Sequence, residues 1–495
     1  MTTPGTLGAR VRTGIWWSAL NNLTLRLGTL VTGILLARLL DPEAFGVFAI
    51  ALTVQTALMT LSELGLAADL IRHGDIDRRG PTIATLSLVS SGFLTVAVLL
   101  AAPAFADFFA APEATAVIRV MALTLLLAGI GVVPFARLQR DLRQRELFHI
   151  ELVAFVLSTG LALGLAVAGW GAISIAIGRL VSQTAVVVLQ FVLTRTRPRV
   201  GWDRSVAWSG LRFGLPLSLA GLLSLGLLNV DNVAVGRLGG VTVLGLYSIA
   251  FNLSSWPSSI VGTAIRAVAM PAFAEIHRSG TGDATATLAR ACGLTWAVAV
   301  PMSVGLAVLA HPVVTILYGE RWAAAATALV WLAPLGALRI LIDVWVAYLT
   351  AHGRSLLLLG CQLLWFLSLV PAMWWAVQGR GLAGAGLAHI AVASLVAVPA
   401  FLVALRIAGV GSGPVVRALG VPLAAAVPTV GVGVLAVTAL DDPWLQLSVA
   451  GLAMSGVYAL AAGPHLRRLT LDDAPADRPP PPTAAASTVG SHRAA

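Results

Sequence analysis

The stretch ARLLDPEAFGVFAIA at 37–51 is matched 199 positions later by GRLGGVTVLGLYSIA at 236–250. The two copies share residues of the same type at several aligned positions, among them Arg38 with Arg237, Gly46 with Gly245, Ile50 with Ile249 and Ala51 with Ala250, and Phe48 is matched by another aromatic residue, Tyr247. Each copy lies at a turn between two apolar segments. The repeat therefore predicts that the chain is built from two related halves.

Composition places this chain in a membrane. Hydrophobic residues make up 58% of its 495 residues and charged residues only 11%, whereas a soluble globular protein carries about 25% charged residues. The basic residues are all Arg, and the absence of Lys excludes a Walker A loop and a Lys Schiff base. The net charge of +10 is more typical of Arg clustered on one membrane face than of nucleic-acid binding, because the chain is so apolar.

Apolar runs of about 20 residues, the length of a membrane-crossing helix, recur along the chain. They predict an all-α polytopic membrane protein with about 14 transmembrane helices, near 14–39, 44–66, 82–103, 115–136, 149–169, 171–193, 209–232, 241–264, 286–310, 322–349, 355–377, 383–408, 415–438 and 445–463. The connections are too short to hold a soluble catalytic domain.

Arginine residues set the predicted orientation. With Arg10 and Arg12 in the cytoplasm, the connections that face inward carry most of the Arg residues, including the cluster from Arg137 to Arg145 and the cluster from Arg195 to Arg204. Such an asymmetry is typical of cytoplasmic loops. We therefore expect a bacterial plasma-membrane protein with both termini in the cytoplasm.

The repeat and the helix count together predict the domain organisation. An even number of crossings separates the two copies, so the two halves have the same orientation and are related by an axis along the membrane normal. The expected parts are a cytoplasmic N-terminus at 1–13, a six-helix lobe at 14–200, a second six-helix lobe at 201–410, two further transmembrane helices at 411–465 and a disordered cytoplasmic tail at 466–495, which is rich in Pro and Ala.

Three polar residues on the first predicted helix indicate a binding cavity. A charged side chain at the centre of a membrane helix costs about 2.5–3.5 kcal/mol on insertion scales and normally faces a polar cavity or a partner. Asn22, Arg26 and Thr29 are spaced by four and three residues, which places them on one helix face. They predict a cationic stripe in a central cavity. The alternative is an Arg side chain that reaches the membrane interface or a neighbouring helix carbonyl.

Other intramembrane polar residues are weaker candidates. Arg179, Ser182 and Gln183 form a second polar face, for which helix–helix hydrogen bonding is an equally good account. The candidates for gating or for coupling to an ion are Glu63, Asp231, Asn232, Arg237, Arg266, Arg339 and Asp343. Asp231 could instead pair with Arg237, Arg339 and Asp343 could form a structural ion pair, and Glu63 and Arg266 could be ordinary interfacial charges.

Enzyme signatures are weak. Asp75 and Asp77 form an Asp-x-Asp pair, but they lie in a short Arg-rich loop, and no His pair has zinc-site spacing. Asp41, Pro42 and Glu43 are explained by the start of a helix. We therefore expect no catalytic residue, no metal site and no cofactor.

The stretch GILLARLLDPEAFGVFAIALTVQTALMTLSELGLAADLIR, together with VDNVAVGRLGGVTVLGLYSIAFNLSSWP, VAMPAFAEI, PFARLQRDLRQRELF and LYGERWAAAA, resembles the lipopolysaccharide O-antigen and exopolysaccharide flippase family. That family belongs to the multidrug/oligosaccharidyl-lipid/polysaccharide (MOP) exporter superfamily. The resemblance covers about residues 10–410. It implies a V-shaped pair of six-helix lobes, alternating access, and transport of a polyprenyl-pyrophosphate-linked oligosaccharide from the cytoplasmic to the outer leaflet for cell-surface polysaccharide biosynthesis.

The resemblance also implies partners and roles for particular residues. The partners would be the lipid-linked oligosaccharide, the bilayer, a coupling ion such as H⁺ or Na⁺ and the polysaccharide polymerase machinery. Arg26, which matches the cationic cavity position on the first helix of related flippases, and Arg179 would bind the pyrophosphate, and Asn22, Ser182 and Gln183 would bind sugar hydroxyls. The alternatives are cation-coupled efflux of small molecules, a membrane-embedded glycosyltransferase or polymerase, and a scramblase without energy coupling.

Overall fold

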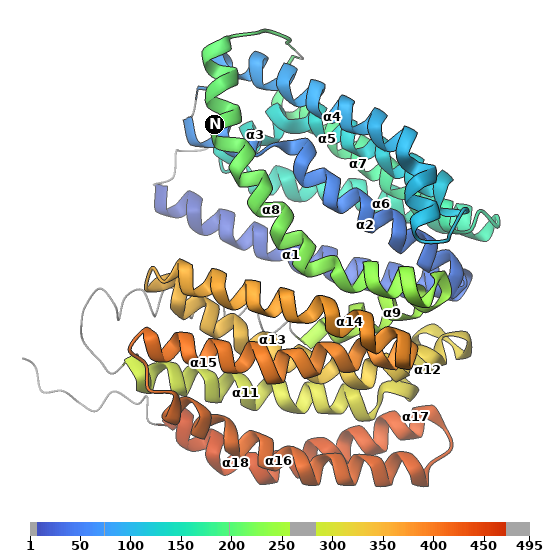
Figure 1. The fold of residues 1–495 in the computed structure, drawn as a ribbon, viewed down its shortest axis with the longest axis vertical. Helices are drawn as coiled ribbons and strands as arrows, with labels where there is room; N and C mark the ends of the chain where they lie inside the picture. The colour runs from blue at the N-terminus through green and yellow to red at the C-terminus, as the bar shows by residue number, and fades with distance from the viewer. Residues whose placement is uncertain (1–6, 74, 198, 258–283, 472–495) are drawn as a thin grey trace, which may run out of the picture.

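The computed structural model describes residues 7–73, 75–197, 199–257 and 284–471, and its regular elements in these ranges are all helices (Figure 1). The N-terminal half holds α1 (Leu7–Leu39), α2 (Pro42–Glu63), α3 (Leu66–His73), α4 (Ile76–Phe108), α5 (Ala114–Arg140), α6 (Gln144–Val167) and α7 (Ala172–Thr194). The rest holds α8 (Arg204–Gly239), α9 (Val241–Ser254), α11 (Ala284–Val308), α12 (Ala310–Tyr318), α13 (Ala326–Ala351), α14 (Ser355–Val392), α15 (Val398–Ile407), α16 (Ser412–Ala439), α17 (Pro443–Leu445) and α18 (Gly451–Leu471).

Ten helices, or runs of consecutive helices, in the described ranges are long and apolar enough to cross a membrane, where the sequence predicted about fourteen. The prediction also included α1, α8 and α9, which are not among the ten. It further divided the run Leu356–Ile407 into two crossings. In that run, Gly381 has a non-helical backbone with a φ of 54°, and the chain folds back there (Figure 1). The chain is therefore an all-α, multi-pass membrane protein.

The connections between the helices are shorter than the sequence predicted, because many of the charged residues assigned to them belong to the ends of helices. Arg78 and Arg79 lie in the first turns of α4, and Arg137 and Arg140 lie in the last turns of α5. The tail predicted to begin at residue 466 is helical as far as Leu471, and the rest of it lies outside the described residues. Long helices can extend past the hydrocarbon because their ends are hydrated and need no apolar side chains.

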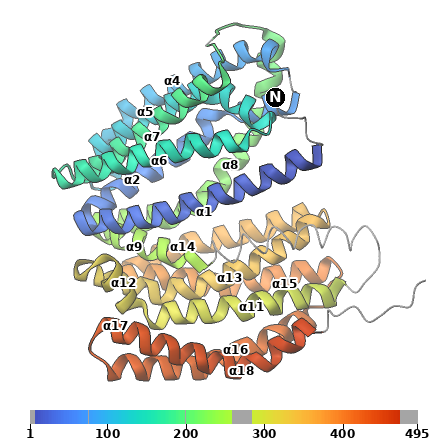
Figure 2. The same ribbon diagram turned by 180° about the vertical axis from the view of Figure 1, so that it is seen from behind.

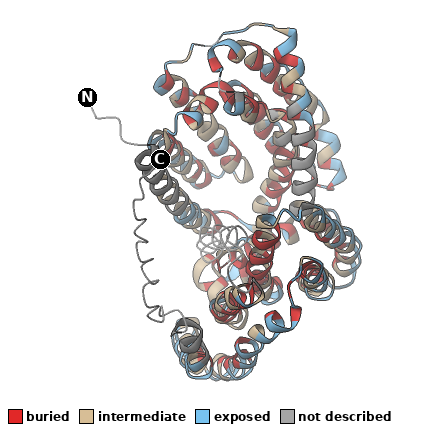
Figure 3. Ribbon diagram, turned by 90° about the vertical axis from the view of Figure 1, so that its left-hand side faces the viewer, coloured by how far each residue is buried: buried red, intermediate tan, exposed pale blue. Residues whose placement is uncertain are grey.

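The helices form two groups that lie one above the other in Figures 1 and 2. The first group, here the N lobe, contains α1–α7, and the second, the C lobe, contains α8, α9 and α11–α15. Within the C lobe α8 lies closest to the N lobe, and α16 and α18 lie along the far edge. We call the end where α1 begins and α18 ends the proximal end, and the opposite end, where α1 meets α2, the distal end. Viewed along the helices, buried residues lie mainly where helices face one another (Figure 3).

The repeated stretches form the contact between the lobes at the distal end. Gly46 of α2 and Gly245 of α9 lie against the partner helix: an added Cβ would lie 1.9 Å from the Val241 carbonyl oxygen at Gly46, and 1.8 Å from the Pro42 carbonyl oxygen at Gly245. No other residue type fits so close a backbone approach. The duplication predicted from the sequence thus places equivalent glycines in reciprocal contact.

Candidate functional site: a cavity between the lobes

A cavity of about 760 Å³ lies between the two lobes, within the range of 300–1,000 Å³ usual for ligand sites. One face of each of α1, α2, α6 and α7 forms its wall on the N-lobe side. On α7, Ile175, Gly178, Arg179, Ser182 and Val186 contribute, with the spacing of one helical stripe. Helices α8, α9 and α12 close the other side.

The wall of this cavity is rich in neutral polar groups. Nine Ser or Thr residues contribute, namely Thr29, Thr32, Thr53, Thr56, Ser158, Thr159, Ser182, Ser248 and Ser255. Three Asn residues, Asn229, Asn232 and Asn252, add amide groups on the C-lobe side. Hydroxyl and amide groups can both donate and accept hydrogen bonds. Five of these hydroxyls already donate to nearby backbone carbonyl oxygens, and Thr32 and Thr159 bond each other. The wall therefore offers a ligand acceptor oxygens and amide groups set in an apolar surface.

Two charged residues contribute to the wall, one of each sign. Arg179 on α7, a predicted cavity residue, is exposed and lies in the wall. Glu151 on α6 is the other, and Asn21 Nδ2 donates a hydrogen bond to its Oε2 at 2.5 Å. Glu151 was not predicted from the sequence because it lies close to the predicted start of a helix, where charges are common. Its position inside an apolar run was the available signal.

The predicted stripe on α1 meets the cavity in part. Thr29 lies in the wall, and so do Leu30 and Gly33. Arg26 is exposed and is not among the wall residues, although it lies three, four and seven positions before these three residues and so shares their helix face. The Asn22 side chain lies outside the described residues. Gln183, next to Ser182 on α7, is half-buried and does not contribute to the wall.

The distal end of the cavity is sealed by hydrogen bonds between the lobes. Trp322 is fully buried, and its Nε1 donates to the Ala37 carbonyl oxygen at 2.8 Å. Arg38 Nε donates to the Leu317 carbonyl oxygen at 3.1 Å, and its guanidinium also bonds the Ile316 carbonyl oxygen. The largest buried core of the described chain contains residues of both lobes around this seal. The cavity is therefore closed at the distal end.

Arg237, the repeat partner of Arg38, makes the corresponding contact in the other direction. Its guanidinium lies 5.7 Å from the ring centroid of Phe108, at the distal end of α4. The alternative in which Arg237 pairs with Asp231 was wrong, because Asp231 faces the interior of the C lobe instead. Each lobe thus extends one Arg from its first helix to the other lobe, which is what a two-fold relation requires.

Asp231 belongs to a buried cluster beside the cavity. The Tyr247 hydroxyl donates to its Oδ2 at 2.8 Å, and His389 Nε2 lies 3.4 Å from the same oxygen. Asp231 is 2% exposed and His389 is 3% exposed. His389 was not predicted from the sequence, although a His within an apolar run indicates such a role. The cluster borders the cavity through Asn232, whose backbone amide donates to Asp231 Oδ1 at 2.9 Å.

The remaining gating candidates are placed as follows. The Arg339 guanidinium lies 4.7 Å from the ring centroid of Phe251, a residue of the cavity wall. Asp343 is half-buried one turn further along α13. Glu63 is the last residue of α2, and its side chain lies outside the described residues, as does the whole of Arg266.

The sequence of residues 35–327 matches the family described as "Polysaccharide biosynthesis protein". The match covers more than half of the 495 residues. This chain belongs to the polysaccharide biosynthesis protein family. Its relatives include the teichuronic acid biosynthesis protein TuaB of Bacillus subtilis (strain 168), which is 27% identical over 74% of this chain and 77% of the relative. Another is the succinoglycan biosynthesis transport protein ExoT of Rhizobium meliloti (strain 1021), 28% identical over 74% and 73%.

A third relative is the lipopolysaccharide biosynthesis protein WzxC of Escherichia coli (strain K12), 26% identical over 66% of this chain and 67% of the relative. The fold is similar to that of the lipid II flippase MurJ in an inward closed conformation, with a TM-score of 0.74, 13% identity and coverage of 92% of this chain and 99% of that chain. It is also similar to an inward-facing multidrug resistance MATE family transporter of the MOP superfamily, with a TM-score of 0.61, 20% identity and coverage of 79% and 98%. The predicted resemblance to polysaccharide flippases is confirmed at the level of the polysaccharide biosynthesis protein family, and so is the prediction that the chain is not an enzyme.

Proposed function

We propose that this protein moves a polyprenyl-pyrophosphate-linked oligosaccharide from the cytoplasmic to the outer leaflet of a bacterial plasma membrane by alternating access. The observation that carries the proposal is the composition of the cavity between the lobes. Its hydroxyl and amide groups suit a glycan, and the exposed Arg179 guanidinium suits a pyrophosphate, because its fork of N–H donors matches phosphate oxygens. The names of the relatives, which refer to the biosynthesis of teichuronic acid, succinoglycan and lipopolysaccharide, agree with a glycan-containing substrate.

The orientation follows from the Arg residues of the proximal end. Cytoplasmic loops are enriched in Arg, so the proximal end and both termini would face the cytoplasm. The seal made by Trp322 and Arg38 would then close the cavity toward the outside. Transport would require this seal to open while the proximal ends of the lobes come together, as expected for two repeats that rock about a shared site.

Coupling to an ion is assigned to the cluster of Asp231, Tyr247 and His389. Ionisable residues buried within membrane segments commonly belong to ion or proton pathways. The cluster lies beside the cavity wall at Asn232 and Phe251. A change in the charge of the cluster would therefore alter the electrostatic potential at the wall. Fourteen crossings, with the last two outside the pair of six-helix lobes, complete the proposed architecture.

A second candidate function is cation-coupled efflux of a small molecule. Glu151 in the cavity wall favours it, since a carboxylate would attract a cationic compound, and the fold is shared with a multidrug resistance transporter. Arg179 in the same wall opposes it.

Deletion of the gene followed by analysis of lipid-linked sugars separates these functions. The proposal predicts that complete lipid-linked oligosaccharide accumulates in the cytoplasmic leaflet. Accumulation of unextended acceptor lipid would indicate a transferase, and unchanged lipid-linked sugars together with sensitivity to cationic compounds would indicate efflux.

A further inference from the structure

A second cavity of about 350 Å³ lies at the proximal end of the N lobe and shares no residue with the cavity between the lobes. The start of α4, the end of α5 and the end of α7 form part of its wall. The segment that leads from α7 to α8 forms the rest of the wall, here called the mouth. That segment is the connection between the two halves of the chain. Nothing in the proposed transport mechanism uses this cavity.

Four Arg residues surround the mouth of this proximal cavity: Arg137, Arg195, Arg197 and Arg199. Its wall contains one carboxylate, that of Asp77, which forms an ion pair with Arg137. Within the described ranges, no carboxylate pairs with Arg195, Arg197 or Arg199, and all three are exposed. The mouth therefore carries three uncompensated positive charges.

The deeper wall is apolar and faces the lipid. Leu88 of α4 is 40% exposed and Ile130 of α5 is 36% exposed, although both lie inside membrane-crossing helices. An Arg-lined mouth above an apolar, outward-facing wall is the arrangement that an anionic lipid needs, because its headgroup is charged and its acyl chains are not.

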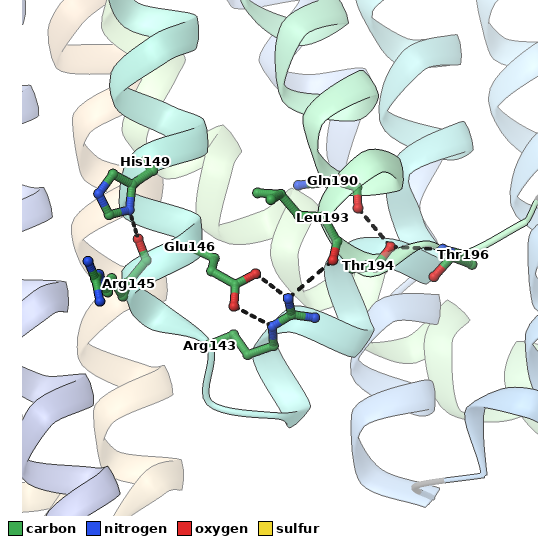
Figure 4. A network of polar contacts seen from close by, with 8 residues as sticks. All are labelled: Arg143, Arg145, Glu146, His149, Gln190, Leu193, Thr194 and Thr196. Carbon is green, nitrogen blue, oxygen red and sulfur yellow. Dashed lines mark hydrogen bonds and ion pairs between the residues drawn. The ribbon is translucent and has the colours of Figure 1, made fainter. Parts of the chain in front are cut away.

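One buried polar atom in the wall lacks a partner. The hydroxyl oxygen of Thr196 is buried and makes no hydrogen bond, a state that normally costs about 1–3 kcal/mol. Its backbone is held in place, because the Thr196 amide donates to Thr194 Oγ1 at 3.4 Å and that hydroxyl donates to the Gln190 carbonyl oxygen at 2.7 Å (Figure 4). The hydroxyl would gain a hydrogen bond if the Thr196 side chain turned toward a ligand in the proximal cavity.

Arg143, at the same end of the N lobe, differs from these Arg residues because it has an acidic partner. Its guanidinium bonds the Glu146 carboxylate and the Leu193 carbonyl oxygen, the latter at 3.2 Å (Figure 4). These contacts fix the loop between α5 and α6 to the last turn of α7. They neutralise Arg143 and leave the adjacent Arg195 without an acidic partner.

We propose that the proximal cavity is a binding site for an anionic phospholipid. The guanidinium groups of Arg195, Arg197 and Arg199 bind the phosphodiester headgroup, and an acyl chain packs against Leu88 and Ile130. Because the Arg residues belong to the segment between α7 and α8, the bound lipid ties this connection between the lobes to the N lobe.

The test is native mass spectrometry of the purified full-length protein with added phosphatidylglycerol or phosphatidylcholine. The wild type should bind phosphatidylglycerol in preference to phosphatidylcholine. The triple variant Arg195→Gln, Arg197→Gln, Arg199→Gln should lose affinity for phosphatidylglycerol on the order of 100-fold, since each Arg near a membrane surface contributes to anionic-lipid binding. The matched control Arg78→Gln, Arg140→Gln, Arg204→Gln removes the same charge from exposed Arg residues outside the cavity and should bind like the wild type.

A second variant keeps the Arg residues and fills the apolar part. Ala84→Trp places a large ring in the wall and should weaken phosphatidylglycerol binding as the triple variant does. Equal phosphatidylglycerol binding by the wild type and the triple variant would overturn the proposal, and so would equal losses in the triple variant and its control. Displacement of the lipid by glycerol 3-phosphate alone at millimolar concentration would overturn the assignment to a lipid.

Discussion

Charged residues inside the membrane decide the chemistry of this transporter. Arg179 could be singled out from the sequence because a charge in an apolar helix is costly without a polar environment, and the structure places it in the cavity wall. The same reasoning applied to Arg26 gives the correct helix face but not contact with the cavity. Glu151 and His389 are also ionisable residues within apolar helices, but they were not predicted. Glu151 lies near the predicted start of a helix, and His389 lies in a run that is otherwise uniformly apolar.

Neutralising Arg179 in the cavity wall, or Arg26 on the helix face that α1 turns to the cavity, should impair transport of an anionic lipid-linked sugar. We expect Arg179→Gln to lower the export rate at least tenfold, because a hydrogen bond to a charged group contributes about 1.5–3 kcal/mol, and Arg26→Ala to abolish export while the protein stays in the membrane. Export can be measured as surface polysaccharide in a deletion strain that carries each variant.

The matched control for these variants is Arg119→Gln. Arg119 is also an exposed Arg in a membrane-crossing helix, and its Nε donates to the Leu99 carbonyl oxygen rather than facing the cavity. It should export at nearly the wild-type rate. Survival of native export in Arg179→Gln and Arg26→Ala would refute the assignment of these residues to the headgroup.

Asp203 caps the N-terminus of α8, and the stability that this cap gives the helix depends on pH. Its side chain accepts hydrogen bonds from the Ser205 hydroxyl and from the backbone amides of Ser205 and Val206, and these bonds lower the pKa of the carboxyl below the ordinary value of 3.8. A lowered pKa stabilises the folded helix start above the ordinary pKa, and this stabilisation is lost as the pH falls through the lowered value.

Hydrogen exchange should report this titration. The Val206 amide should lose protection as the pH falls below 3.8 in the wild type, whereas in Asp203→Asn, whose side chain does not titrate, its protection should be insensitive to pH. The same acid-induced loss in both proteins would show that another group is responsible.

At the scale of elements, the contact between α2 and α9 is set by two glycines that the repeat had aligned. The sequence could show that Gly46 and Gly245 are equivalent, but not that they touch, because contact depends on how the lobes dock. Their reciprocal backbone approach explains why the repeat is conspicuous at this turn: each copy must present a small residue to the other.

Replacing Gly46 with a larger residue should push α2 and α9 apart. In Gly46→Leu the new side chain meets the Val241 carbonyl oxygen, and overpacking of this kind costs about 1–3 kcal/mol. We expect a lower melting temperature in detergent and reduced export. Gly160→Leu on α6 is the control, because an added Cβ there meets no atom within 4 Å; equal melting temperatures for the two variants would contradict the close approach.

At the scale of the whole molecule, the features that could be predicted from the sequence are those that depend on its repeat and on the periodicity of its apolar residues. The long apolar helices and their Arg-rich end follow from local hydropathy and charge, and the relation between the two halves was predicted from the repeat. The seal between Trp322 and Ala37, and the cluster around Asp231, join residues distant in the sequence. They could not be predicted, since no local pattern indicates which helices meet. The shape of the cavity depends on these same contacts.

The central claim is that the cavity between the lobes carries a lipid-linked oligosaccharide across the membrane. Its most direct test is reconstitution of the wild type and Arg179→Gln in vesicles that contain a polyprenyl-pyrophosphate-linked oligosaccharide, with an external glycosidase measuring the fraction of glycan that becomes accessible over time. The wild type should raise that fraction well above the level of protein-free vesicles, and Arg179→Gln should not. Equal rates for the wild type and protein-free vesicles, or for the wild type and Arg179→Gln, would contradict the account.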